Sequence, residues 1–159
     1  DRLLNSATAA ASLAKIRSVD VQGLANLVWS MARQLVLNTP LLDAIFSESI
    51  SKMSEFTSQE LGNMAWSCAK LQLLDLPLMN AIAAEAVRKI TAFNSQELSN
   101  TALAFATLAV QDEQLLAAIA AEMRKRIERG QADNQALSNT AWAFAKLEVY
   151  DAPLSAAIS

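Results

Sequence analysis

Four segments of the chain carry amide and cationic side chains at the same spacing. In each segment an Asn follows a Gln by four residues, and a Lys, Arg or Thr follows the Asn by seven. The twelve residues, here called the amide strip, are Gln22, Asn26, Arg33, Gln59, Asn63, Lys70, Gln96, Asn100, Thr107, Gln135, Asn139 and Lys146. Amides can pair with the edges of bases, and Lys or Arg can contact phosphates, so these residue types suit binding of single-stranded RNA.

Large side chains accompany the amide strip. Trp29, Trp66 and Trp142 stand three residues after the Asn in three segments, and Leu103 takes this place in the remaining one. An aromatic ring can stack on a base. On a helix, at about 100° per residue, the Gln, Asn and Lys or Arg of one segment fall within roughly 40° of one another. Stacked helices are therefore expected to present parallel rows of amides, indoles and cations.

A purely structural origin explains the same residues. Asn is a poor residue for a helix interior, so a recurring Asn needs a compensating bond, which a hydrogen-bond ladder between repeats could supply. Tryptophans commonly serve as packing residues, and Leu103 in one copy indicates that an apolar side chain suffices there. Lys and Arg near a helix C-terminus favour the helix dipole. The sequence leaves both interpretations open.

Other kinds of site find little support in the sequence. The chain has no His and a single Cys, so an internal disulfide, cysteine zinc sites and His-based catalysis are excluded, and Cys68 is expected to be a small buried hydrophobe. The Asp and Glu residues mostly stand at expected helix starts, where capping explains them. We therefore expect no catalytic residues, no metal, no cofactor and no enzyme activity in this segment.

Composition narrows the class of partner. The formal charge is -3 at neutral pH and the pI is about 4.9, which counts against strong non-specific binding of nucleic acid but leaves room for a local cationic strip. No apolar run approaches the roughly 18 residues that a membrane span requires. We expect no membrane insertion.

The elements that position the amide strip repeat along the chain. Similar strings begin at Gln22, Gln59, Gln96 and Gln135, so the spacings are 37, 37 and 39 residues. Each string follows an expected helix N-cap, namely Asp20, Thr57, Asn94 or Asp133. The predicted first helix of each repeat runs for about 16 residues, to a second cap at Asn38, Asp75, Asp112 or Asp151. Two extra residues around Gly130 account for the longer spacing and predict a loop insertion.

A second helix follows the first in each repeat. Its apolar positions recur four and eight residues apart, and a Pro stands in the first turn in three of the copies. Its charged face, which includes Glu85, Lys89, Glu122 and Arg126, is expected to be solvated. Hairpins of this size cannot bury their apolar faces alone, so they must stack into an all-α solenoid. The whole chain 1–159 is predicted to form one such segment: the end of a preceding repeat (1–19), repeats 20–56, 57–93 and 94–132, and a partial repeat (133–159).

The strings QELSNTALAFATL (96–108) and QALSNTAWAFAKL (135–147), together with the repeat length, resemble the octotricopeptide repeat family. The resemblance covers nearly the whole chain. It implies an α-solenoid that binds specific RNA sequences in a chloroplast or mitochondrion and acts in RNA stability, processing or translation. The base-reading positions of that family lie on the first helix, so the resemblance carries them to the amide strip and its neighbours.

Two features depart from what the resemblance implies. The chain has no basic surplus, and the residues expected to be exposed beside the amide strip are small or acidic, for example Glu60, Glu97 and Ala143. Glutamates near a phosphate path weaken binding. An alternative function therefore stands beside RNA binding: a structural or adaptor subunit that binds the protein subunits of a larger assembly, since solenoids also serve as protein-binding scaffolds.

Overall fold

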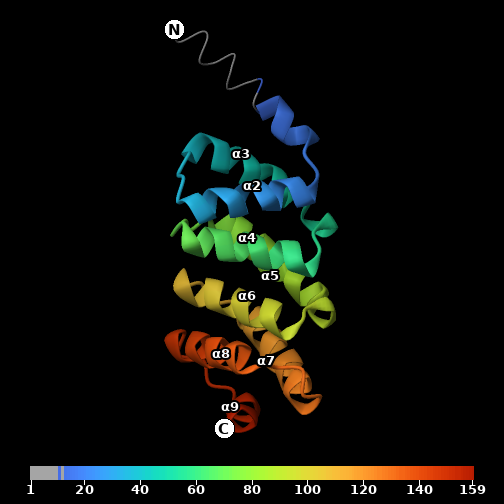
Figure 1. The fold of residues 1–159 in the computed structure, drawn as a ribbon, viewed down its shortest axis with the longest axis vertical. Coiled ribbons are helices and arrows are strands. Elements are labelled where there is room, and N and C mark those ends of the chain that lie inside the picture. Colours follow the sequence, from blue (N-terminus) through green and yellow to red (C-terminus); the bar gives the residue numbers. More distant parts are fainter. Residues whose placement is uncertain (1–10, 12) are drawn as a thin grey trace.

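The computed structural model describes residue 11 and residues 13–159, and all secondary structure in this part of the chain is helical. The helices stack along one long axis, with α2 toward one end and α9 at the other (Figure 1). The first helices of the repeats are α2 (Val21–Gln34), α4 (Ser58–Lys70), α6 (Ser95–Thr107) and α8 (Asn134–Lys146). The second helices are α3 (Thr39–Ser51), α5 (Leu76–Arg88), α7 (Glu113–Glu128) and α9 (Ala152–Ile158). The predicted helical solenoid is confirmed.

The two kinds of helix form two layers. Each first helix packs closely on the first helices before and after it, so α2, α4, α6 and α8 make one continuous layer. The second helices contact their own neighbours less extensively. Tighter packing of the first-helix layer is what the inner, concave side of a curved array requires.

The helix starts follow the predicted caps. Asp20, Thr57, Asn94 and Asp133 each accept a hydrogen bond from a backbone N–H three residues later. Thr57 with Glu60 and Asn94 with Glu97 form complete capping boxes. The second helices begin with the same bond at Asn38, Asp75, Asp112 and Asp151. The caps fix where every described hairpin begins and turns.

The first helices are shorter than predicted. They span 13 or 14 residues instead of about 16, and a tight turn replaces the last half-turn. In each turn one residue takes a left-handed backbone conformation, with φ of 53° to 56°, at Leu35, Gln72, Ala109 and Glu148. The next backbone N–H then bonds to a carbonyl five residues back, as Leu73 does to Cys68. Because none of these four positions is a glycine, residue type alone does not indicate this early helix end.

The two extra residues of the third spacing were predicted as a loop insertion around Gly130, but α7 takes up part of them. Elsewhere the second helix ends in a short 3-10 turn, Met53–Glu55 after α3 and Ile90–Ala92 after α5. In α7 the α-helix continues to 16 residues and ends before Gly130, which has a φ of 67°. The insertion is therefore partly an additional turn of helix and partly a loop.

A continuous apolar core runs between the layers. Its largest fully buried side chains include Phe56, Phe93, Phe105, Leu61 and Ile82. The thiol of Cys68 belongs to this core, and burial, followed by the nearby charge of Asp75, raises its pKa to about 12. The expected role of Cys68 as a small buried hydrophobe is confirmed.

The charged face of the second helices is not simply solvated, so that prediction was wrong. Glu85 and Glu122 are buried, with 6% and 4% of their surface exposed. Glu85 pairs with Lys89 at 2.9 Å, and Lys89 Nζ donates hydrogen bonds to the carbonyls of Ser54 (2.7 Å) and Phe56 (2.6 Å) in the preceding repeat. We call this arrangement the inter-repeat clamp.

The inter-repeat clamp recurs at two further positions. Glu48 pairs with Lys52, which donates to the carbonyls of Arg17 and Val19. Glu122 pairs with Arg126, which donates to the carbonyls of Thr91 and Phe93. These carbonyls lie where one repeat ends and the next begins, so each clamp ties a second helix to the junction before it. The paired charges of the second helices therefore hold neighbouring repeats together, which helical periodicity alone did not indicate.

The predicted remainder of a preceding repeat, residues 1–19, lies largely outside the described residues, and Leu4 is among those not described. Within that segment residues 13–18 are helical, and Ile16 is buried against the core.

Candidate nucleic-acid interface

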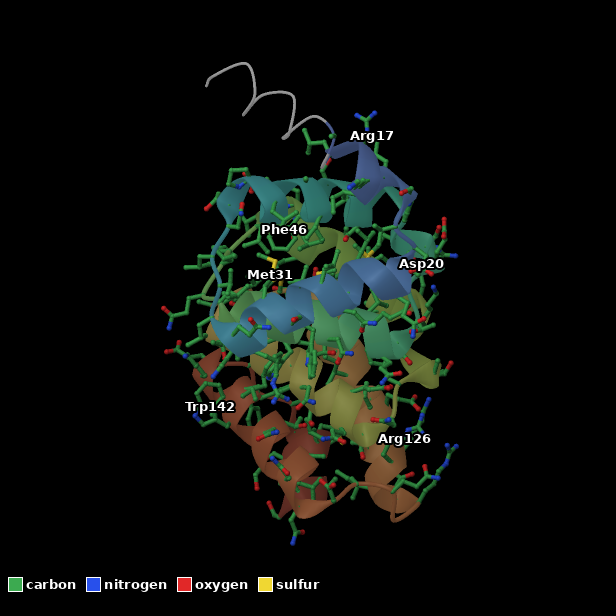
Figure 2. The ribbon with its side chains drawn as sticks, turned by 45° about the horizontal axis from the view of Figure 1, so that its top comes forward. Arg17, Asp20, Met31, Phe46, Arg126 and Trp142 are labelled. Carbon is green, nitrogen blue, oxygen red and sulfur yellow. The ribbon has the colours of Figure 1, made fainter. Side chains whose placement is uncertain are left out.

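The first-helix layer brings the amide strip residues of all four copies to its surface. All four Gln side chains are exposed, as are Arg33, Lys70, Thr107 and Lys146, while the Asn residues are exposed in α2 and half-buried in α4, α6 and α8. In Figure 2, Trp142 lies at the edge opposite Asp20 and Arg126. The cations of the amide strip stand in the last turns of α2, α4 and α8, so they share the edge that Trp142 occupies.

The amide groups have no protein partner in the described part of the chain. The polar bonds inside these helices come from hydroxyls instead: Ser67, Thr101 and Thr140 each donate to the carbonyl four residues back. No hydrogen bond joins the Asn side chains of neighbouring described repeats, so the ladder that the sequence left open does not form. Because these amides are at least partly exposed, they are free to bind water or a ligand.

Amides from neighbouring repeats nevertheless lie side by side. Gln96 and Asn100 of α6 line one small hollow together with Gln135 and Asn139 of α8. Its volume of about 10 Å³ leaves room for roughly one water molecule. Amides of α6 and α8 are therefore adjacent, and a ligand there would meet donors and acceptors of two repeats at once.

The tryptophans take two different positions. Trp66 packs against the apolar core and is half-buried, as the packing interpretation expects. Trp29 and Trp142 are 40% and 47% exposed. The guanidinium carbon of Arg33 lies 5.0 Å from the Trp29 ring centre, and Lys146 Nζ lies 4.8 Å from that of Trp142. Such cation–π pairs hold an indole and a positive charge together at the surface.

The acidic and small neighbours of the amide strip are less exposed than the sequence suggested. The carboxylates of Glu60 and Glu97 bond to the backbone N–H groups of Thr57 and Asn94, which turns them toward the helix start. Ser67, Ala104 and Ala143 are buried between repeats, contrary to expectation. These two carboxylates therefore lie at the N-terminal ends of α4 and α6, whereas the cations of the amide strip lie at the C-terminal ends of first helices.

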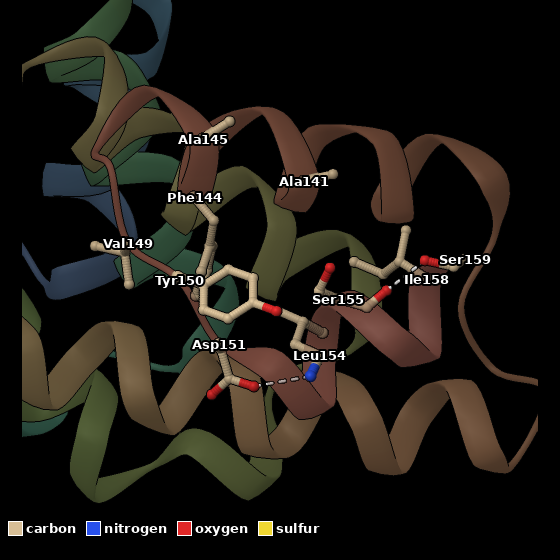
Figure 3. A pocket seen from close by; sticks show the side chains of 10 residues that line it. All are labelled: Ala141, Phe144, Ala145, Val149, Tyr150, Asp151, Leu154, Ser155, Ile158 and Ser159. Atoms are coloured by element: carbon tan, nitrogen blue, oxygen red, sulfur yellow. Dashed lines mark hydrogen bonds between the residues drawn. The ribbon is translucent and has the colours of Figure 1, made fainter.

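The turns between first and second helices form a surface that the sequence analysis missed. Several large apolar side chains are exposed there: Leu35, Val36, Leu37, Leu74, Leu76 and Tyr150. Hollows of about 80 Å³ and 320 Å³ open beside these turns. A further apolar groove of about 280 Å³ lies between α8 and α9, lined by Phe144, Leu154 and Ile158 among others (Figure 3). An apolar residue at the same position in three of the four turns, at Leu37, Leu74 and Tyr150, was the available signal, with Gln111 in the remaining turn.

The described residues do not form a metal site or a membrane-spanning helix. No group of three or more His, Cys, Asp or Glu side chains is placed to hold a metal ion there. Nor does that part of the chain contain a helix long and apolar enough to cross a membrane. The polar groups that the structure does gather are the amides and cations of the first-helix layer.

Comparison with known proteins adds a family. Residues 1–158 match the family model described as RNA-editing substrate-binding complex 6 protein. The chain belongs to this family. No curated protein sequence matches the chain. The family's description names an RNA-editing substrate-binding complex, so it is associated with RNA, and the match does not single out the octotricopeptide repeats that the strings in α6 and α8 resemble.

Proposed function

We propose that the chain binds single-stranded RNA along its first-helix layer, as part of a larger protein assembly. One observation carries the proposal: the four described repeats expose amide groups on the first helices, with no hydrogen-bond partner among the described residues, and those of α6 and α8 lie side by side, while three of these helices also end in an exposed cation. A row of unpaired amides suits the edges of unstacked bases, because each amide offers both a donor and an acceptor. The description of the family, which joins RNA editing, substrate binding and a complex, supports the same assignment.

The charges of the layer suggest how RNA lies on it. The exposed cations Arg33, Lys70 and Lys146 all stand at the C-terminal ends of first helices, whereas the Gln residues stand in the first turns. The phosphates would therefore follow the cationic edge while the bases point across the helices toward the amides. Trp29 and Trp142, each already paired with a cation, would stack on bases at the first and fourth copies.

The third copy is built differently. It has Leu103 in place of a Trp and Thr107 in place of a cation, but its amides Gln96 and Asn100 share a hollow with those of α8. We therefore propose that this copy contributes hydrogen bonds to a base and little stacking or phosphate contact. Binding through the four copies would be graded, with phosphate contacts from the first, second and fourth copies and stacking from the first and fourth.

The resemblance to octotricopeptide repeats suggests a finer assignment. On that basis the protein would read specific RNA sequences in a chloroplast or mitochondrion and act in RNA stability, processing or translation, without catalysing a reaction itself. Imaging of the tagged protein against plastid and mitochondrial markers tests the location. Signal confined to the cytosol or the nucleus would contradict it.

Binding can be tested with the 159-residue chain. Fluorescence anisotropy with a labelled single-stranded RNA of random sequence is expected to report binding whose affinity falls as salt increases, because phosphate contacts release counterions. Substituting Lys70→Ala and Lys146→Ala together should weaken binding and reduce the salt dependence by about two contacts. Lys125→Ala is the matched control, since Lys125 is an exposed lysine of the second-helix layer, 54% exposed at the side chain.

Two outcomes would reject the proposal. The first is that no RNA is retained even at low salt. The second is that Lys125→Ala weakens binding as much as the double substitution at Lys70 and Lys146, which would move the RNA to the other face. Substituting Asn63, Asn100 and Asn139 by Ala should lower affinity with little change in the salt slope, because amides contribute hydrogen bonds and no charge.

A structural or adaptor role is the second candidate. The exposed apolar side chains at the turns, such as Leu37, Leu74 and Tyr150, favour it, because large exposed apolar groups that cluster commonly mark protein interfaces. The two roles use different surfaces of the same solenoid. Variants of one surface would separate the two roles. A variant of the amide strip should lose RNA binding and keep assembly, and a variant of the turns should lose assembly and keep RNA binding.

A further inference from the structure

Two hollows on the edge that carries the turns between first and second helices occupy the same register in different repeats. One is lined by Thr39, Leu42, Asp43, Phe46, Leu73, Leu74 and Asp75. The other is lined by Gln111, Glu113, Leu116, Ala117, Phe144, Glu148, Val149, Tyr150 and Asp151. Leu42, Leu73 and Leu74 of the first correspond to Leu116, Val149 and Tyr150 of the second at the repeat spacing. We call them the edge pockets.

Each edge pocket has an apolar floor. Leu42 and Phe46 are buried at the base of the first, and Leu116 and Phe144 at the base of the second. Leu74 and Tyr150 stand on the rims and are 54% and 80% exposed. The volumes of about 80 Å³ and 320 Å³ suit an aliphatic and a larger side chain, respectively. An apolar side chain from a partner would bury its own surface and that of the rim residue.

The rims of both edge pockets are acidic. Asp43 and Asp75 border the first, while Glu113, Glu148 and Asp151 border the second. Asp75 and Asp151 each cap a helix through one oxygen, and Figure 3 shows this bond from Leu154 to Asp151. No lysine or arginine lines either pocket. An acidic rim repels phosphate, so the pockets themselves are unsuited to RNA and complementary to basic side chains, although Lys70 and Lys146 stand on the first helices just before these turns.

We propose that the edge pockets bind a segment of a protein partner that carries aliphatic or aromatic anchor residues flanked by Lys or Arg. The apolar floor takes the anchor, and the rim carboxylates pair with the flanking cations. This role is independent of RNA binding, since the pockets share no residue with the amide strip. The pockets lie two repeats apart, so one extended partner can engage both and gain affinity from the second contact.

A peptide pair tests the proposal with the 159-residue chain. One fluorescent peptide has two leucines flanked on each side by two lysines, and its partner peptide has glutamates in place of the lysines. The basic peptide is expected to bind and the acidic peptide to bind at least about tenfold more weakly, because like charges face each other in the second case.

Variants locate the site. Asp43→Lys with Glu148→Lys should weaken the basic peptide by about tenfold and improve the acidic one, since neither residue caps a helix. Leu74→Ser with Tyr150→Ser should weaken both peptides. Glu128→Lys, an exposed change at the opposite end of α7, is the control and should leave both affinities unchanged. Circular dichroism of each variant establishes that it remains folded.

Two results would overturn the inference. They are failure of the basic peptide to bind at millimolar concentration and equal binding of the two peptides. The RNA-binding proposal survives both, since its own test uses Lys70 and Lys146 on the first-helix layer.

Discussion

Removing the cation of one inter-repeat clamp should destabilise the whole array. In Lys89→Met the aliphatic stem remains, but Nζ is lost together with its bonds to the carbonyls of Ser54 and Phe56 and its ion pair with Glu85. Bonds of charged groups contribute about 1.5–3 kcal/mol, and breaking a buried pair costs about 3–5 kcal/mol. Because 30% of the Lys89 side chain is exposed, we expect a loss of about 2–3 kcal/mol.

Arg88→Met provides the matched control. Arg88 pairs with the same carboxylate, Glu85, at 3.0 Å, but its side chain is 71% exposed and it makes no bond to the preceding repeat. Its loss should cost less than about 0.5 kcal/mol. Urea unfolding followed by far-UV circular dichroism compares the two variants. In thermal unfolding, Lys89→Met should lower Tm by roughly 5–10 °C, given about 2–4 °C per kcal/mol for a chain of this size.

Equal effects of Lys89→Met and Arg88→Met would refute this account of the clamp. A second check uses Glu85→Gln: combined with Lys89→Met, it should cost clearly less than the sum of the two single changes, because the single change at Lys89 leaves a buried carboxylate poorly compensated.

Three further outcomes follow from the structure. Gln72→Gly should raise the free energy of unfolding by about 0.5 kcal/mol in urea titrations, since Gln72 has a φ of 54°, whereas Gln72→Ile should lower it by more than about 1 kcal/mol. Thr57→Ala should cost about 1 kcal/mol by removing the cap that pairs with Glu60, and an unchanged urea midpoint would contradict the capping box. Burial raises the pKa of Cys68 from 9.0 to about 12, so stability should be complete below pH 9 and fall by about 1.4 kcal/mol per pH unit between pH 9 and 12. In Cys68→Ala the free energy of unfolding should not show this decline. Urea unfolding of both proteins at several pH values between 9 and 12 measures the difference.

The repeat and its caps could be predicted because they depend on local chemistry. A side-chain oxygen at Thr57 or Asn94 satisfies a backbone N–H three residues away, so the sequence within one turn decides the helix start. The alternation of helices follows from the same signals repeated. The ends of the first helices were predicted less well, because Leu35 and Gln72 take a left-handed backbone conformation that Leu and Gln rarely adopt.

Contacts between repeats could not be predicted from the sequence. Lys89 looks like any exposed lysine of an amphipathic helix until the carbonyls of Ser54 and Phe56 appear beside it, 35 and 33 residues earlier in the chain. The same limit applies to the candidate sites. Periodicity placed the amides on one face but did not distinguish an exposed Trp142 from a half-buried Trp66, which have identical register. Nor did it indicate the edge pockets, whose walls come from adjacent repeats.

Ultraviolet crosslinking of the folded chain to single-stranded RNA, followed by mass spectrometry of the crosslinked peptides, tests the central claim most directly. The account predicts crosslinks in the peptides that contain Trp29, Asn63, Asn100 and Trp142, all on the first helices. Crosslinks confined to α3, α5 and α7, or to the edge pockets, would contradict it.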